Sequence, residues 1–148
     1  MNQQQARNIE TVRSHYDRTW NQQDLDLIDQ THHADCVHHD PSNPASMCGT
    51  AQLKAHLEAV FDAFPDVHMH IDQISASGED VFVRWTTEAT HSGEFMGMPG
   101  TGRRVRFSGI IQHRLRDGRI EEDWSIRDTL SFLTQLGALP APGAPPPK

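Results

Sequence analysis

The sequence predicts an α+β fold, in which a curved antiparallel sheet wraps around helices from the N-terminal half. Before residue 65, apolar residues recur at intervals of three and four in two segments, which is the spacing of amphipathic helices. After residue 65, apolar and polar residues alternate along several segments separated by turn residues, which is the spacing of strands. A sheet curved around the early helices would enclose a conical interior, a common setting for a small-molecule pocket.

Residues 8–30 predict two helices, the second one short, because their apolar positions share a face on either side of a polar break at 21–24. Residues 33–41 (HADCVHHDP) are too short and too proline-bounded for a helix, so we expect an irregular strand and then a loop at 41–49. Thr50 is expected to cap a helix over 51–64, which stops before Pro65.

The second half of the chain predicts strands and one closing helix. The expected strands cover 67–72, 81–95, 104–115 and 119–126, and an Asp-Gly turn at 117–118 joins the last two as a hairpin. A short helix at 128–137 is expected to be capped by Asp128 and ended by Gly137. We expect one domain over 1–139 and a disordered proline-rich tail over 140–148.

The composition limits the classes of partner that we expect the protein to bind. With 13 basic and 20 acidic residues, the net charge of −7 argues against nucleic acid, whose phosphates bind clustered Lys and Arg. The N-terminus lacks the apolar core of a signal peptide, and no apolar run approaches the roughly 18 residues of a membrane span. Two cysteines, Cys36 and Cys48, do not form a secreted disulfide framework. We therefore expect a soluble cytoplasmic protein that binds neither nucleic acid nor membrane.

Motifs spread over about residues 9–139 occur in an informative order. They are HADCVHHDP, FPD, VRW, ATHSGEFMGMPGTGR, the strand–Asp-Gly–strand pair and DWSIRDTLSFLTQLG. As an ordered set they resemble the SnoaL-like polyketide cyclase family, and the most specific part is THSGEFMGMPGTGR followed at a distance by QLG. The resemblance implies the nuclear transport factor 2-like fold, a cone with an interior pocket that ketosteroid isomerases and scytalone dehydratase share.

The resemblance also implies a chemistry. Characterised members close a ring by aldol condensation of a polyketide methyl ester, without metal or cofactor. An aspartate on the last strand serves as acid/base, with a histidine on the preceding strand. Counting back from QLG without gaps, the aspartate's position is Ser125 and the histidine's is Ile111, whereas RFSG as the anchor places the histidine on His113. This chain therefore departs from the family at its acid/base position.

The last hairpin carries residues that could replace the family's aspartate, and the type of turn determines which face of the sheet they lie on. A two-residue turn would put His113 opposite Glu122, whereas a turn with a glycine bulge at Gly118 would put His113 opposite Glu121. We choose the bulged turn, because the family's histidine and aspartate work on one face. The inner face then carries His113, Glu121, Asp123 and Ser125. In an apolar cone the pKa of Asp123 should rise, which would let it act as acid/base near neutral pH; Glu121 and Asp123 can also be read as solvated strand residues.

Several other residues are candidates for the pocket. The family pattern carries a histidine at His91, for which pocket contact and a structural hydrogen bond to the glycine-rich loop both stay open. A polar residue near His38 or His39 lines the pocket mouth in the family. Trp85 is a candidate for substrate contact, although core or dimer-face positions are commoner for tryptophan.

The histidine-rich stretch THHADCVHHD at 31–40 raises the question of a metal site. Adjacent residues on a strand point to opposite faces, so the pairs His32–His33 and His38–His39 each offer one ligand to a given side. Sets such as Cys36 with His38 fall short of the three or four converging ligands of a zinc site. We predict pocket lining here, with no metal and no cofactor, and keep a solvated strand end and, more weakly, metal binding as alternatives.

The leading hypothesis is a cofactor-independent enzyme that acts on an apolar, carbonyl-bearing small molecule by aldol cyclisation, isomerisation or dehydration. Asp123 would be the acid/base, while His113, His91 and His39 would polarise the carbonyl or orient the substrate, in a pocket lined also by His38, Ser125, Ile111, Glu121 and Trp85. The alternative is a non-catalytic binding module of the same fold, since Ser125 replaces the family's aspartate. The resemblance implies a homodimer, and Ile110, Trp124 and Ile126 would form an apolar stripe on the outer face of the sheet.

Overall fold

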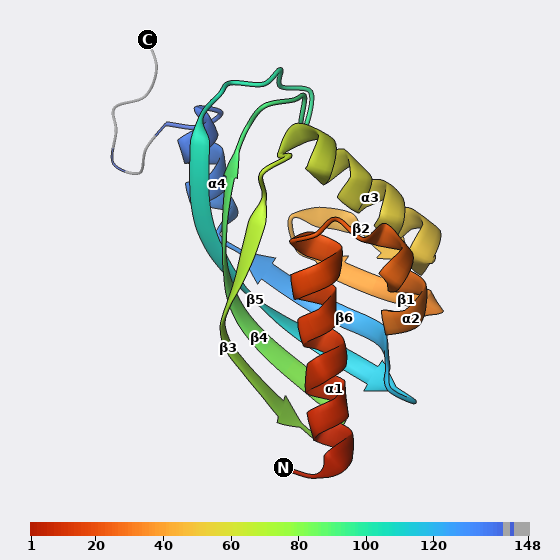
Figure 1. The fold of residues 1–148 in the computed structure, drawn as a ribbon. Helices are drawn as coiled ribbons and strands as arrows, with labels where there is room; N and C mark the ends of the chain where they lie inside the picture. The colour runs from red at the N-terminus through yellow and green to blue at the C-terminus, as the bar shows by residue number, and fades with distance from the viewer. Residues whose placement is uncertain (141–142, 144–148) are drawn as a thin grey trace.

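The computed structural model describes residues 1–140 and 143. Apart from Pro140 and Gly143, the predicted tail over 140–148 lies outside the described residues. Figure 1 shows a curved sheet with the N-terminal helix α1 and the long helix α3 on the same side of it. The α+β cone predicted from the sequence is thus confirmed. Among the described residues, no helix has the length and apolarity needed to cross a membrane.

The N-terminal segment forms the predicted long helix and short second helix. α1 spans Gln3–Ser14, starts at a capping box between Asn2 and Gln5, and continues as a π-helical segment over His15–Trp20. A short 3-10 turn at Leu25–Leu27 leads into α2, Ile28–Thr31. The wider π-helical turns, which often occur at functional sites, place the side chains of His15 and Tyr16 inside the molecule.

Six strands form one sheet in the order β2-β1-β6-β5-β4-β3. Their bounds are β1 His32–Asp40, β2 Asn43–Cys48, β3 His68–Ser77, β4 Asp80–Thr90, β5 Arg104–Arg116 and β6 Arg119–Arg127. The predicted all-antiparallel sheet was wrong in one respect, because β1 pairs with β6 in parallel. The chain leaves β1 through β2 and α3, and only after the β3–β6 meander does β6 come to lie beside β1. The segment 41–49, predicted as a loop, was also wrong, since most of it pairs with β1 as the edge strand β2.

The later helices test the predicted caps. α3 spans Gly49–Ala63, and its N-cap is Cys48 rather than Thr50, which lies inside the first turn. The side-chain oxygen of Gln52 accepts a hydrogen bond from the Cys48 N–H at 2.8 Å, while the Cys48 side chain makes no capping hydrogen bond to the first turn. α4, Thr129–Leu136, has the predicted caps: Asp128 accepts from the Ser131 N–H, and Gly137 ends the helix at φ 82°.

The β5–β6 hairpin has neither of the two registers considered from the sequence. Asp117 and Gly118 both have positive φ, which makes a two-residue turn, so the bulge predicted at Gly118 was wrong. The irregularity lies further along, where Arg114 pairs with Glu122 and Leu115 with Ile120. Glu121 is the extra residue of this bulge. As a result His113 lies directly opposite Asp123, and Ile111 opposite Ser125.

Candidate active site

A cavity of about 190 Å³ lies between the concave face of the sheet and the helices. Its walls are mostly apolar and come from α3, β4 and β5, with contributions from Leu57, Phe64, Trp85, Val105 and Phe107. Among its polar lining residues, five contact one another and are called the polar end below: His15, Tyr16, His38, His113 and Asp123. An apolar chamber with a few convergent polar groups at one end is the usual form of a small-molecule site.

Asp123 is the centre of the polar end. It lies on β6, its residue is only 3 % exposed, and its Oδ2 is 2.8 Å from Nδ1 of His38. The parallel pairing of β1 with β6 puts His38 beside Asp123, although the two residues are 85 positions apart. The imidazole donates this hydrogen bond to the carboxylate.

His113 approaches the same carboxylate from β5. Its Nδ1 lies 3.2 Å from Oδ2 of Asp123, at ion-pair distance but without the angle of a regular hydrogen bond. Its Nε2 is 3.1 Å from the hydroxyl of Tyr16. Since the carboxylate favours a proton on Nδ1, Nε2 accepts the hydrogen bond from the Tyr16 hydroxyl. Tyr16, His113, Asp123 and His38 thus form a continuous polar chain.

The imidazoles of His113 and His38 keep the Asp123 carboxyl ionised. Burial by itself would raise the pKa of this carboxyl, but the neighbouring His113 and the hydrogen bond from His38 outweigh burial and hold the pKa well below 3.8. The raised pKa expected for an aspartate in an apolar cone was therefore wrong. Burial likewise lowers the pKa of His38, yet the hydrogen bonds with Asp123 and Cys36 raise it to about 10. At neutral pH the pair is an imidazolium beside a carboxylate.

Two more buried histidines surround this pair. The ring of His15 lies 4.8 Å from that of His32, which in turn lies 5.7 Å from the ring of His38. Burial lowers the pKa of His15 to about 3 and that of His32 well below 6.5, so both are neutral. Within the described residues, Nδ1 of His15 and Nε2 of His32 have no hydrogen-bond partner.

The other residues predicted for the pocket divide into two groups. His39, Trp85, Ile111 and Ser125 line the cavity, as do His38, His113 and Asp123. His39 also donates or accepts at two partners, Ser46 and Glu122, and its ring stacks on Trp124. This places it at the rim between β1 and β6.

Glu121 and His91 are not among the lining residues of the cavity. The bulge turns Glu121 away from the inner face, where its carboxylate accepts a hydrogen bond from Arg116 at 2.8 Å. His91 is buried against Phe64, and its Nδ1 lies 3.0 Å from the hydroxyl of Thr101. Of the two roles left open for His91, this geometry corresponds to the hydrogen bond with the glycine-rich loop.

Sequence reasoning missed two members of the polar end, His15 and Tyr16, and also the buried position of His32 beside them. Tyr16 follows Val12 at helical spacing in the predicted helix, so the pattern counts it among the apolar positions and its hydroxyl gives no separate signal. His15, its neighbour, is carried inward only because the helix widens at this point. His32 ends α2 and begins β1, so the strand alternation used for the pair His32–His33 does not describe it.

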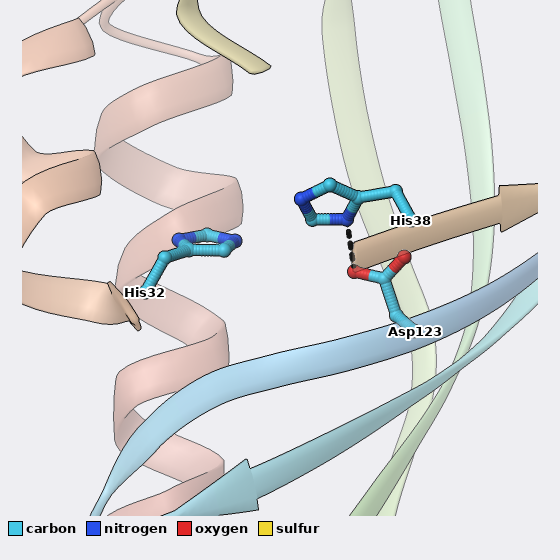
Figure 2. A group of neighbouring side chains, drawn as sticks. All are labelled: His32, His38 and Asp123. Atoms are coloured by element: carbon cyan, nitrogen blue, oxygen red, sulfur yellow. Dashed lines mark hydrogen bonds and ion pairs between the residues drawn. The ribbon is translucent and has the colours of Figure 1, made fainter. Parts of the chain in front are cut away.

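The structure also identifies the residues with metal-ligand geometry. One ligand atom from each of His32, His38 and Asp123 lies within 4.8 Å of the other two (Figure 2). Cys36, predicted as one possible ligand, is buried with its Sγ 3.3 Å from Nε2 of His38, and both Cys36 and Cys48 are free thiols.

Comparison with known proteins supports the fold. The model of the SnoaL-like polyketide cyclase family matches residues 10–136. A candidate SnoaL-like polyketide cyclase from Jannaschia sp. CCS1 superposes with a TM-score of 0.86 at 25% identity, covering 95% of this chain and 98% of that one. A search of curated proteins finds no significant match.

Two Streptomyces structures are similar at higher identity. AclR, a candidate hydroxylase from Streptomyces galilaeus, is 31% identical with a TM-score of 0.82 and covers 95% of this chain and 86% of its own. IdmH, a candidate polyketide cyclase from Streptomyces antibioticus, is also 31% identical, with a TM-score of 0.76 and coverage of 88% and 98%.

Proposed function

Since this chain belongs to the SnoaL-like polyketide cyclase family, we propose that it is a cofactor-independent enzyme that moves protons on an apolar, carbonyl-bearing small molecule. The reaction would be an aldol cyclisation or a related isomerisation or dehydration. Each of these needs a base that removes a proton next to a carbonyl group and an acid that supports the developing oxyanion.

The observation that carries this proposal is the position of the pair His113–Asp123. Counted back from QLG without gaps, the family's histidine and aspartate positions fall on Ile111 and Ser125, which face each other across β5 and β6, whereas RFSG as the anchor places the histidine on His113 itself. His113 and Asp123 are the next inward-facing pair of the same hairpin, one step closer to its turn. The pair is thus available on the same two strands and the same face, and both residues line the cavity.

In this proposal Asp123 is the base. Its carboxylate is ionised at neutral pH because His113 and His38 lower its pKa, so it can accept a proton from carbon without first losing its own. The low pKa makes Asp123 a weaker base. Its fixed position offsets this, because a carboxylate held at the wall of an apolar cavity reacts without the reorganisation that water requires.

His38, His113 and Tyr16 would supply the acid side. The imidazolium of His38 carries a proton beside the carboxylate. Tyr16 lines the cavity, and its hydroxyl donates to His113. Either group would have to release its present acceptor, His113 for Tyr16 and Cys36 or Asp123 for His38, before it donates to an oxygen that becomes an enolate. A donor held there lowers the barrier because negative charge develops at that oxygen.

The apolar walls support a substrate with a large hydrocarbon surface and few polar groups. We also propose that the protein works in the cytoplasm, without nucleic acid or membrane, as a homodimer. On the outer face of the sheet Ile110 and Ile126 pair across β5 and β6 and are 56% and 67% exposed. Two adjacent exposed isoleucines on a strand pair favour contact with a second copy.

A binding module of the same fold is the second candidate, favoured by Ser125 at the family's acid/base position. Proton exchange separates the two candidates. An aryl β-keto ester is incubated with the protein in D₂O and followed by ¹H NMR. An enzyme removes the signal of the proton between the carbonyl groups faster than buffer alone does. A binding module broadens the ligand signals but leaves exchange at the buffer rate, and that result would contradict the proposal.

A further inference from the structure

Beside the proposed acid/base pair, three donors of metal-ligand type converge. His32 ends α2 and starts β1, His38 lies six residues further along β1, and Asp123 lies on β6. One ligand atom of each lies within 4.8 Å of the other two. Figure 2 shows a ring nitrogen of His32 directed toward His38 and Asp123.

The hydrogen bonds of His32 indicate which of its nitrogens is protonated. Its Nδ1 is 2.8 Å from the hydroxyl of Thr31, and that hydroxyl also lies 3.4 Å from the carbonyl oxygens of Leu27 and Ile28. Since a carbonyl can only accept, the Thr31 hydroxyl donates to the carbonyls and accepts from the Nδ1–H of His32. Nε2 of His32 therefore carries a free lone pair.

Nothing among the described residues uses this lone pair. Nε2 of His32 is buried without a hydrogen-bond partner, and the whole residue is 1 % exposed. Buried polar atoms in folded proteins nearly always have a partner, and a bound ion can supply one. A histidine whose second nitrogen is held by a protein acceptor is also the arrangement seen in metal ligands, because the held nitrogen fixes the tautomer and the ring orientation.

We propose that His32, His38 and Asp123 bind one divalent first-row transition metal ion of the Zn²⁺ class. Two imidazole nitrogens and one carboxylate oxygen form a donor set that binds these ions in preference to Mg²⁺ or Ca²⁺. The ion would replace the proton between His38 and Asp123. Because both of these residues line the cavity, a fourth position would stay open toward the pocket for water or a ligand oxygen.

This site goes beyond the proposed function and has a consequence for it. The ion would occupy the lone pairs of Asp123 and His38 that proton transfer needs. The metal-bound protein would therefore lose acid/base turnover, and Zn²⁺ would act as an inhibitor. Binding is measurable without any substrate, so the metal site and the proposed function can fail independently.

The test is calorimetric titration of the full, EDTA-treated protein with ZnCl₂, compared with two variants. The wild type is expected to bind one Zn²⁺ per chain, and His32→Gln should weaken binding by at least about 100-fold, more than the loss of a residue that only orients a ligand. The matched control is His70→Gln, which removes an exposed histidine next to another on β3 and should leave binding unchanged. No binding by the wild type, equal binding by His32→Gln, or loss of binding in His70→Gln would each overturn the proposal.

A second measurement covers the case in which His32→Gln does not fold. X-ray absorption of the zinc-loaded wild type is expected to show two imidazoles and oxygen ligands at about 2.0–2.2 Å. Sulfur at about 2.3 Å would place the ion on Cys36 or Cys48 instead and contradict the site.

Discussion

His113 and Asp123 face each other across β5 and β6, with Nδ1 of His113 3.2 Å from Oδ2 of Asp123. Both side chains line the cavity, and both residues are almost completely buried. The pair exists because the bulge at Glu121 shifts the register of the hairpin by one residue. A hairpin without that bulge would put Glu122 opposite His113, and Asp123 would leave the inner face.

Removing the hydroxyl of Tyr16 tests the polar chain. Tyr16→Phe leaves Nε2 of His113 buried without its donor, so the free energy of unfolding should fall by about 1–3 kcal/mol. Turnover should fall as well, because the proposed donor to the oxyanion is lost. Urea unfolding and the deuterium-exchange assay measure the two effects. Unchanged turnover at unchanged stability would show that Tyr16 takes no part in the site.

The buried neutral histidines predict a loss of stability in mild acid. The pKa of His15 is lowered to about 3 and that of His32 well below 6.5, whereas in the unfolded chain both titrate near 6.5. Below pH 6.5 the unfolded state therefore binds more protons, and stability falls as the pH falls. The slope should approach about 1.4 kcal/mol per pH unit for each histidine.

The measurement is urea unfolding of the metal-free protein between pH 6.5 and 5. In His15→Asn the slope should be smaller than in the wild type, while His70→Asn, an exposed control, should keep the wild-type slope. Two neighbouring groups work in other pH ranges. His38, with its raised pKa of about 10, contributes stability below pH 6.5 that is lost as the pH rises toward 10. Asp123, with its lowered pKa, contributes stability above pH 3.8 that is lost only at lower pH.

A charge on the outer face of the sheet should prevent dimer formation. Ile126→Glu places a carboxylate in the exposed pair Ile110–Ile126, where burial in an interface would leave it unpaired. Light scattering after size-exclusion chromatography should change from a dimer to a monomer. Met96→Glu changes an exposed apolar residue of the loop between β4 and β5 and should leave the dimer intact. A wild-type monomer, or a dimer in Ile126→Glu, would show that this face is not the interface.

The sequence predicts those parts of the fold that depend on local signals. The caps of α4 at Asp128 and Gly137 and the alternation along β3 to β6 come from residues close in the chain. The parallel contact of β1 with β6 does not, because it joins His38 to Asp123 over 85 residues. The order of the motifs indicated the family and therefore the fold, whereas the hydrophobic periodicity alone indicated only the α+β class.

The candidate site was predictable in part. His113 and Asp123 could be named from the hairpin and the resemblance, and parity along the strands put them on one face. Their register could not be predicted, since the bulge at Glu121 has no glycine or proline to mark it. The low pKa of Asp123 was also out of reach, because it depends on His38 from a distant strand.

The central claim is that proton transfer has moved from the family's position at Ser125 to Asp123. The most direct measurement compares the deuterium-exchange rates of Asp123→Asn and Ser125→Ala with that of the wild type at pH 7.5. Both residues line the cavity on β6, so each variant alters the same wall. The claim predicts that Asp123→Asn loses at least about 100-fold in rate, the scale of a general base, while Ser125→Ala stays within a few-fold of the wild type. Retained exchange in Asp123→Asn, with the loss found in Ser125→Ala, would contradict it.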